Sequence, residues 1–276
     1  TLQGLNQMKS AFLSLASHEL RTPLTTILSG AEFLQSQTEE LLGDNEKRAL
    51  NVIIRASQRL NHIVDDLLDA ARLEARTLYI ARESFNPFMM INELITEFKP
   101  RYQKNKINLE LQEFPDDTVL RGDAHHLKRA LGRLLENAIK FTPEGGMVHI
   151  AGRTLQQEIV VGLSGELNAF SENFFDGALA ESYLQISISD SGIGIDKADQ
   201  LRIFDKFQEV GDISTHSTSQ AQFGGKGVGL GLTLAKGIIE THDGLVWVES
   251  AGVDQGSCFS ALLPLANPNE ERYVLG

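Results

Sequence analysis

Residues 17–23 read Ser-His-Glu-Leu-Arg-Thr-Pro, and this stretch decides the interpretation of the chain. If the segment is helical, His18 and Thr22 stand four residues apart on one face of the helix. Glu19 can accept a hydrogen bond from one imidazole nitrogen and leave the other nitrogen as a nucleophile. Pro23 lacks an N–H, and an interior proline costs about 3 kcal/mol, so it loosens the helix beside the histidine.

Two other interpretations of this stretch differ in strength. A surface helix that carries a histidine and a proline without any function fits the stretch taken alone. A zinc protease does not fit, because its His-Glu-x-x-His motif needs a second imidazole where this chain has Thr22.

The composition is that of a globular chain with room for two domains. The chain has 276 residues, of which 42% are hydrophobic and 22% charged. The net charge of −12 argues against a nucleic-acid partner. No apolar run approaches the ~18 residues of a membrane span, and a single cysteine, Cys258, fits a reducing compartment. We therefore expect a cytoplasmic protein with no membrane contact in this part.

Residues 1–76 carry two helical apolar stripes. The first begins at Leu5 without a capping residue, which indicates a helix that continues from upstream sequence in a longer protein. The second runs from Ile53 to Ala70. An antiparallel hairpin cannot bury both stripes alone, whereas two hairpins paired in a four-helix bundle can. The pattern therefore predicts an all-α domain that forms a homodimer.

After Arg76 the pattern becomes mixed, which indicates an α+β sandwich. We predict a linker at 77–83, a second domain at 84–266 and a polar tail at 267–276. Asn86 and Pro87 predict a helix that ends near Phe98, and Asp123 predicts the cap of a helix that ends at Phe141. The other predicted elements are strands at 107–111, 147–151, 184–189, 245–249 and 258–263, and helices near 197–206 and 229–241.

Three blocks of the second domain carry nucleotide chemistry. Asn137 offers a neutral oxygen for Mg²⁺ and Lys140 a charge for phosphate, although a polar stripe on a helix is usually only solvated. Asp190 ends a strand, where it can accept a hydrogen bond from an adenine amino group, and the glycines after it allow close approach. The glycine-rich stretch 224–232 precedes a helix N-terminus that can hold phosphate, and we expect residues 208–222 to form a mobile lid.

Two familiar phosphate-binding motifs are excluded for this glycine-rich stretch. A Walker loop needs Ser or Thr after its lysine, and here Gly227 follows Lys226. No Gly-x-Gly-x-x-Gly register fits the stretch either, so the sequence does not predict a Rossmann fold.

In this order the blocks resemble the sensor histidine kinases of two-component signalling. The resemblance covers Leu5 to Leu265 and implies a dimerisation and phosphotransfer hairpin followed by a Bergerat-type ATP-binding domain. The matching stretches are Phe12–Thr25 for the H box, Leu134–Phe141 for the N box, Asp190–Ile195 for the G1 box, Ile203–Phe207 for the F box and Gly227–Leu232 for the G2 box.

The resemblance also implies roles for single residues. His18 would take the γ-phosphoryl group of ATP and pass it to an aspartate of a response regulator, with Glu19 orienting or deprotonating the imidazole. Thr22 would position water to dephosphorylate the regulator. Asn137 is the one metal ligand that the resemblance implies, for Mg²⁺, and Asp190 would select adenine. The other residues implied in cofactor binding are Lys140, Gly192, Gly194, Ile195, Phe204, Phe207, Lys226, Gly227, Gly229, Leu230, Gly231 and Leu232. The whole would be the cytoplasmic catalytic core of a longer sensor, either membrane-anchored or soluble.

Two alternatives and two departures belong to this interpretation. Conformational ATPases of the same fold, such as DNA gyrase B and the mismatch-repair ATPases, carry a general-base Glu four residues before the Mg²⁺ Asn. Here that residue is Arg133, which cannot take a proton from water. A kinase-dead scaffold that only dimerises is the other alternative, which the intact blocks disfavour. Arg133 also stands where the family often has Asn, and Val228 replaces a usual Thr or Ser.

Residues 153–183 make an unusually long connection between two predicted strands. Its acidic residues outnumber its single base, Arg153, so it would repel phosphates and we expect it to lie outside the ATP site. Phe170, Phe174 and Phe175 suggest a short element that packs on the domain or on a partner. A tethered surface loop is the favoured interpretation, because long connections tolerate insertions at little cost.

Overall fold

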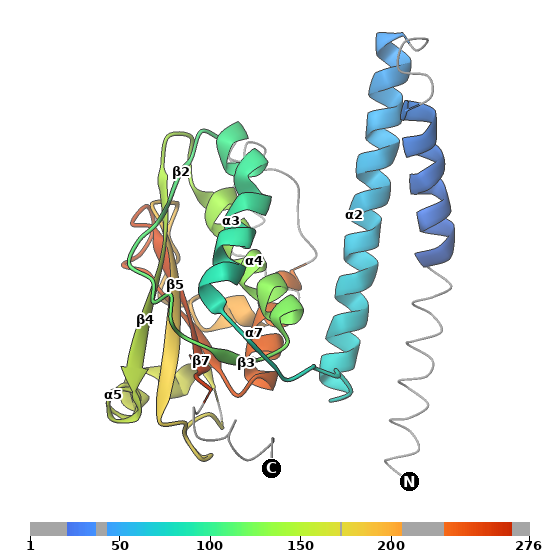
Figure 1. The fold of residues 1–276 in the computed structure, drawn as a ribbon. Helices are drawn as coiled ribbons and strands as arrows, with labels where there is room; N and C mark the ends of the chain where they lie inside the picture. Colours follow the sequence, from blue (N-terminus) through green and yellow to red (C-terminus); the bar gives the residue numbers. More distant parts are fainter. Residues whose placement is uncertain (1–20, 37–42, 172, 206–228, 267–276) are drawn as a thin grey trace. The chain divides into compact units, whose positions relative to one another are not determined.

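The computed structural model describes residues 21–36, 43–171, 173–205 and 229–266, and the chain divides into two compact units (Figure 1). The first unit comprises Thr1–Tyr79 and the second Ile80–Gly276. Among the described residues, no helix is long and apolar enough to cross a membrane.

The first unit is a helical hairpin. Residues 21–36 are helical, and α2 (Asp44–Glu74) runs back along them. Ala31, Leu50 and Ile54 form a small core between the two helices. Arg21 Nη2 lies 2.8 Å from Asp65 Oδ1 and adds an exposed ion pair between the helices. Other members of the apolar stripes stay exposed within one chain, among them Phe33, Ile53, Leu60 and Leu67.

The second unit is built on a five-stranded sheet in the order β2-β4-β5-β7-β6. β2 pairs in parallel with β4, and the other neighbours are antiparallel. A separate antiparallel pair joins β1 to β3. The strands are β1 (Glu83–Phe85), β2 (Asn108–Leu111), β3 (Leu120–Gly122), β4 (Met147–Gln156), β5 (Ser182–Asp190), β6 (Leu245–Glu249) and β7 (Ser257–Pro264).

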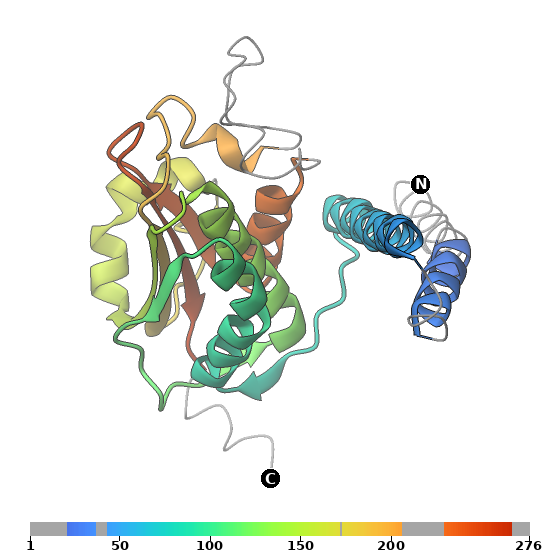
Figure 2. The same cartoon turned by 90° about the horizontal axis from the view of Figure 1, so that it is seen from above.

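Three helices cover one face of this sheet (Figure 2). They are α3 (Pro87–Lys104), α4 (Ala124–Phe141) and α7 (Gly231–Thr241). Both predicted caps are confirmed: Asn86 Oδ1 accepts from the Met89 amide and Asp123 Oδ1 from the His126 amide, each at 3.0 Å. The sandwich of helices on a mixed sheet is therefore confirmed.

Two predicted helices were wrong in their bounds or type, and the strand predicted at 147–151 continues to Gln156. The helix expected to end near Phe98 continues through Pro100 to Lys104. Pro100 and Thr96 are both exposed, so water can reach the Thr96 carbonyl that the proline leaves without an N–H partner. The helix expected near 197–206 is instead a turn followed by a short 3₁₀ helix, η2 (Arg202–Phe204). Asp196 accepts a hydrogen bond from the Ala198 amide at 2.9 Å, and this local bond favours the turn.

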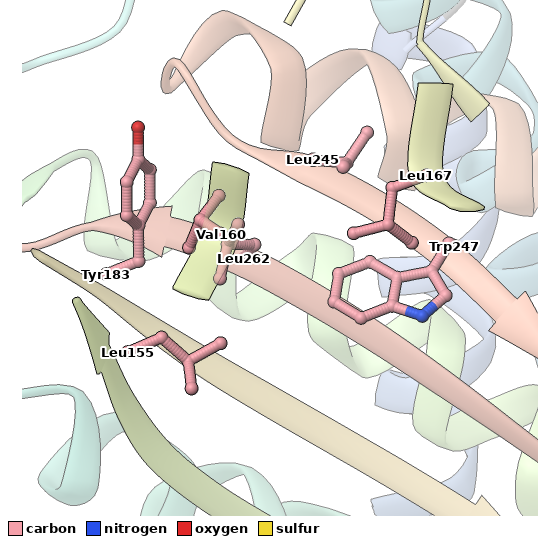
Figure 3. Packing of buried hydrophobic residues seen from close by; sticks show 7 residues of the cluster. All are labelled: Leu155, Val160, Leu167, Tyr183, Leu245, Trp247 and Leu262. Carbon is pink, nitrogen blue, oxygen red and sulfur yellow. The ribbon is translucent and has the colours of Figure 1, made fainter. Parts of the chain in front are cut away.

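The expectation of a tethered surface loop at 153–183 was also wrong. After β4 the chain forms α5 (Gln157–Gly162), α6 (Ser164–Leu167) and the 3₁₀ helix η1 (Asn168–Phe170) on the sheet face opposite α3, α4 and α7 (Figure 2). We call residues 157–181 the covering segment. They close a second hydrophobic cluster formed by Leu155, Val160, Leu167, Tyr183, Leu245, Trp247 and Leu262 (Figure 3).

Side-chain alternation explains why the covering segment packs there. In β5, Leu184, Ile186 and Ile188 point one way and Tyr183 points the other. Leu184 and Tyr183 are both buried, so this end of the sheet is apolar on its two faces. The Ala180 amide also donates to the Tyr183 hydroxyl at 2.8 Å. A sheet end with two apolar faces needs a cover on each side, and the covering segment supplies the second.

A buried histidine closes the end of the unit where α4 begins. The Asp123 amide donates to His242 Nε2 at 3.0 Å, and His242 Nδ1 lies 2.8 Å from the Ile238 carbonyl oxygen. Nδ1 therefore carries the proton and the ring is neutral. Burial lowers the pKa of the His242 imidazole from its ordinary value.

The packing of the covering segment predicts that two substitutions within it differ in their effect on stability. Leu167 is 5% exposed and points toward the indole ring of Trp247 (Figure 3), whereas Ile159 on α5 is 52% exposed. We expect Leu167→Ala to lower the free energy of unfolding by about 2–5 kcal/mol and Ile159→Ala to change it by at most about 0.5 kcal/mol. The fluorescence of Trp247, the only tryptophan, reports this unfolding in urea. Equal effects of the two substitutions on the free energy of unfolding would contradict the packing of the covering segment on the sheet.

The neutral ring of His242 predicts an acid-sensitive fold. The pKa of His242 is near 6.5 in the unfolded chain and lower in the folded chain. As the pH falls through 6.5, the unfolded chain therefore binds a proton before the folded chain does. Stability should therefore fall as the pH drops from about 7.5 to about 5.5. His242→Gln should show a smaller drop in the urea midpoint, and His125→Gln, an exposed neighbour on α4, should keep the full drop.

Candidate functional site

The candidate site is organised along α4. One face of this helix is buried, with Leu127, Leu131, Leu134 and Leu135 each at most 1% exposed. Arg133, Asn137 and Lys140 are half-buried and lie on a second face at helical spacing. The Lys140 ammonium stands 4.9 Å from the ring centroid of Phe141. α4 thus presents a polar stripe at the edge of the core rather than in open solvent.

The turn after β5 is fastened to the C-terminal end of α4. The Ile193 amide donates to the Phe141 carbonyl at 3.2 Å, which places residues 190–195 beside the last turn of the helix. A Cβ on Gly192 would lie 2.5 Å from that same carbonyl oxygen, so no side chain fits there. Asp190 and the C-terminal half of α4, predicted as one site from separate blocks, are therefore brought together.

Asp190 is held by two donors of its own unit. Its Oδ1 accepts from the Gly192 amide at 2.8 Å and its Oδ2 from the Ser257 hydroxyl at 2.6 Å. Burial raises the pKa of the Asp190 carboxyl from its ordinary value, and these hydrogen bonds lower it in part. A carboxylate has about four acceptor positions, so capacity remains for a ligand donor.

A second turn, at 250–256, supports the first. The Ile195 amide donates to Ser250 Oγ at 3.0 Å, and the Gly256 amide donates to the Gly192 carbonyl at 3.0 Å. Gly194 has φ +66°, and a Cβ there would lie 2.0 Å from the Gly252 carbonyl oxygen. Gly194 is thus required by the contact between the two turns and Gly192 by the contact with the end of α4, in addition to any contact with a base.

The start of α7 meets α4 at the other end of the polar stripe. A Cβ built on Gly231 would lie 3.8 Å from Arg133 Nη1, so the guanidinium is next to the first turn of α7. Leu230, the residue before the helix, is buried and makes no side-chain cap, and Gly229 has φ +69°. Uncapped N–H groups beside an arginine suit a phosphate. Leu232 is half-buried in the same turn.

Of the remaining predicted residues, some are described by the structure and others lie outside its described ranges. Phe204 is 4% exposed and packs against Phe170 and Phe259, so its ring anchors the chain within the core. Thr22 is exposed on the first helix, and its carbonyl accepts from Thr26 Oγ1 at 3.0 Å. Several predictions lie outside the described residues: the roles of His18, Glu19, Phe207, Lys226 and Gly227, the lid at 208–222 and the departure at Val228.

Sequence reasoning missed the residues that support Asp190. Ser257 follows a turn that carries no nucleotide motif, and it lies 67 positions away from Asp190 in the chain. The register of β5 and β7 pairs these two residues directly, so only knowledge of strand pairing could have identified the contact. The same holds for Arg133, whose neighbour Gly231 comes from a distant block.

Two families match the two units. The family described as His Kinase A (phospho-acceptor) domain matches residues 8–76. The family described as histidine kinase-, DNA gyrase B- and HSP90-like ATPase matches residues 122–267. The chain belongs to the histidine kinases. It combines a phosphoacceptor domain with an ATP-binding domain, and ATP is the nucleotide of this family.

Named relatives agree with this assignment. The sensor histidine kinase AruS of Pseudomonas aeruginosa is 33% identical over 265 residues, which cover 96% of this chain and 23% of AruS. The sensor histidine kinase RcsC of Escherichia coli is 31% identical over 262 residues, which cover 94% of this chain and 24% of RcsC. The chain thus spans about a quarter of the length of these relatives.

Solved structures show the same fold. Full-length ShkA in complex with AMPPNP has a TM-score of 0.69 at 21% identity, covering 93% of this chain and 46% of ShkA. The histidine kinase AdeS of Acinetobacter baumannii has a TM-score of 0.56 at 22% identity, covering 91% of this chain and 98% of that chain. The helical unit followed by a sheet-based ATPase unit is therefore the architecture of known histidine kinases.

The burial of Asp190 predicts that its charge serves binding rather than stability. Because the folded pKa is raised, ionisation at neutral pH opposes folding, and this opposition disappears as the pH falls. We expect Asp190→Asn to keep or raise the thermal midpoint near pH 7.5 and to weaken ATP binding about ten- to hundredfold. Calorimetry with and without ATP measures both. Asp196→Asn, an exposed carboxylate on the next turn, is the control and should change neither.

Proposed function

We propose that this chain is the catalytic core of a sensor histidine kinase that phosphorylates His18 with ATP and passes the phosphoryl group to an aspartate of a response regulator. The observation that carries the proposal is the convergence of three distant blocks on α4. Asp190 lies at the C-terminal end of the helix and the start of α7 lies beside Arg133. In this proposal, Asp190 would bind adenine at one end of the polar stripe, and the start of α7 with Arg133 would bind phosphate at the other.

The proposed transfer is a displacement at the γ-phosphorus. The unprotonated imidazole nitrogen of His18 forms the new N–P bond while the bond to the bridging oxygen of ADP breaks, and the leaving group takes the electron pair. Glu19 accepts the proton from the other imidazole nitrogen or holds it in place. Most of the catalytic effect in such transfers comes from positioning and charge neutralisation.

Asn137 fits a divalent cation in this scheme. Its side chain is half-buried on the polar stripe and has no hydrogen bond within the described part of the chain. An amide oxygen is a ligand that Mg²⁺ accepts, and the ion would neutralise charge on the phosphates. Lys140 and Arg133 supply two further positive charges along the same stripe.

Dimerisation is part of the proposal. The hairpin leaves Phe33 63% exposed and Val52 66% exposed, together with other apolar residues of both helices. A second copy of the hairpin would cover these side chains in a four-helix bundle. The partner regulator would then take the phosphoryl group from His18 of that bundle.

Dephosphorylation of the regulator completes the proposal, with Thr22 positioning the water. Thr22 is exposed on the helix that carries residue 21, and Arg21 pairs with Asp65 of α2 beside it. The relative LuxQ of Vibrio vulnificus, 30% identical over 258 residues, is named an autoinducer 2 sensor kinase/phosphatase. The same hydroxyl would have no role in transfer from ATP.

A conformational ATPase of the same nucleotide fold is less well supported. Such an enzyme needs a base that activates water near the γ-phosphate. The residue at the relevant helical turn is Arg133, and its guanidinium faces Gly231. A positive group there suits phosphate binding and cannot remove a proton.

The experiment is labelling with ATP that carries a radioactive γ-phosphate. We expect the wild-type chain to acquire label that is acid-labile and base-stable, as phosphohistidine is. His18→Gln should abolish the label and His62→Gln, a histidine of α2, should retain it. Asn137→Ala should lose the Mg²⁺-dependent labelling by at least about tenfold. Label that persists on His18→Gln would refute the assignment, and hydrolysis without any label would favour the ATPase.

A further inference from the structure

One residue of the covering segment, Phe170, contacts Phe204 of the predicted nucleotide site. The 3₁₀ helix η1 of this segment carries Phe170, which is half-buried. The Phe170 and Phe204 rings meet edge to face, with centroids 6.3 Å apart and planes at 88°. The covering segment therefore buries one face of the sheet and also contacts Phe204, the last residue of η2.

Phe204 is joined in turn to the start of α7. The Thr233 hydroxyl, in the first turn of α7, donates to the Phe204 carbonyl at 2.9 Å. The Lys236 ammonium, one turn further along, stands 6.0 Å from the Phe204 ring centroid. The other side of the ring meets Phe259 of β7, with centroids 6.3 Å apart. Phe204 is thus packed between the covering segment, the sheet and the helix.

The first turn of α7 carries the predicted phosphate-binding residues. Leu230, Gly231 and Leu232 precede Thr233 directly, and Gly231 faces Arg133 across the stripe. A shift of Phe204 would move the Thr233 hydrogen bond, and with it the backbone amides at the helix start. The position of these amides depends on what fills the space beside Phe204.

We propose that Phe170 of the covering segment is a positioning residue of the nucleotide site. It fixes the Phe204 ring and, through Phe204 and Thr233, the N-terminal turn of α7. The inference rests on the proposed function for its consequence on ATP, but the mechanical link itself is independent of it. Phe170 acts through Phe204 and does not touch the nucleotide.

The competing explanation is that Phe170 only fills the second cluster, against which it packs. A matched residue separates the two. Phe174 belongs to the same segment and packs on Phe175 and Tyr183, with centroids 4.9 and 5.9 Å apart. Its recorded ring contacts do not include Phe204. Phe174→Leu therefore perturbs the cluster but spares the link to α7.

The test compares Phe170→Ala, Phe170→Tyr and Phe174→Leu in the whole chain. Phe170→Ala should raise the KM for ATP in self-phosphorylation about two- to tenfold, with kcat within about twofold. Phe170→Tyr keeps the ring and should restore the wild-type KM. Phe174→Leu should lower the thermal midpoint but leave the KM unchanged. If Phe170→Ala does not fold, Phe170→Leu, which keeps apolar volume without a ring edge, replaces it.

A second readout does not require nucleotide. Hydrogen exchange at the Leu234 amide, which donates to the Leu230 carbonyl at 2.9 Å, should be faster in Phe170→Ala than in wild type, and unchanged in Phe174→Leu. Unchanged exchange and KM in a folded Phe170→Ala would overturn the inference, as would equal changes in Phe174→Leu. A wild-type chain that binds no ATP while the exchange difference persists would instead refute the proposed function alone.

Discussion

The seating of α4 on the sheet is the constraint on which the nucleotide site depends. Its leucine face is completely buried, so the helix cannot rotate or slide without opening the core. The polar stripe therefore has a fixed direction, and both ends of the helix are used. Asp123 caps its start and donates its own amide hydrogen to His242 Nε2, while the Phe141 carbonyl at its end accepts from the Ile193 amide. The turn that carries Asp190 is thus positioned by a main-chain contact, which does not depend on the identity of residue 193.

The close approach of main chains around this contact leaves no room for a Cβ on neighbouring residues, and this explains the glycines of the turns. Two turns pack so closely that a Cβ at 194 or 256 would lie 2.0 Å from a carbonyl oxygen. Asp190 is half-buried beside these turns, and this burial raises the pKa of its carboxyl, while two internal donors hold the carboxylate in place. The carboxylate has then given up part of its hydration before any ligand arrives. A base that donates to it gains a stronger hydrogen bond than it would make with an exposed carboxylate.

The sequence allowed prediction of the parts governed by local rules. Asn86 and Asp123 act as caps because their side chains bond amides three residues away, and such bonds depend only on neighbours. The pairing of the strands could not be predicted from such local rules, because it joins residues that are far apart in the sequence. Ser257 meets Asp190 only because β7 lies beside β5, and Gly231 meets Arg133 only because α7 packs on α4. The covering segment was misjudged for a related reason: Leu155 and Tyr183 become an apolar surface only when two strands are placed side by side, and neither strand shows it alone.

The two units differ in how they bury their apolar side chains, and this difference is relevant to the organisation of the proposed kinase. The ATP-binding unit buries both faces of one sheet end within a single chain, because the covering segment closes the second face. The hairpin does the opposite. In its described part, Ala31, Leu50 and Ile54 form a small core between the helices, while apolar side chains on both helices, such as Phe33 and Val52, are exposed. A unit that completes its own core can move as a rigid body, whereas a hairpin of this kind gains stability from a second copy. The proposed phosphotransfer would use this difference, since the nucleotide unit would have to reach a histidine of the proposed bundle without unfolding either unit.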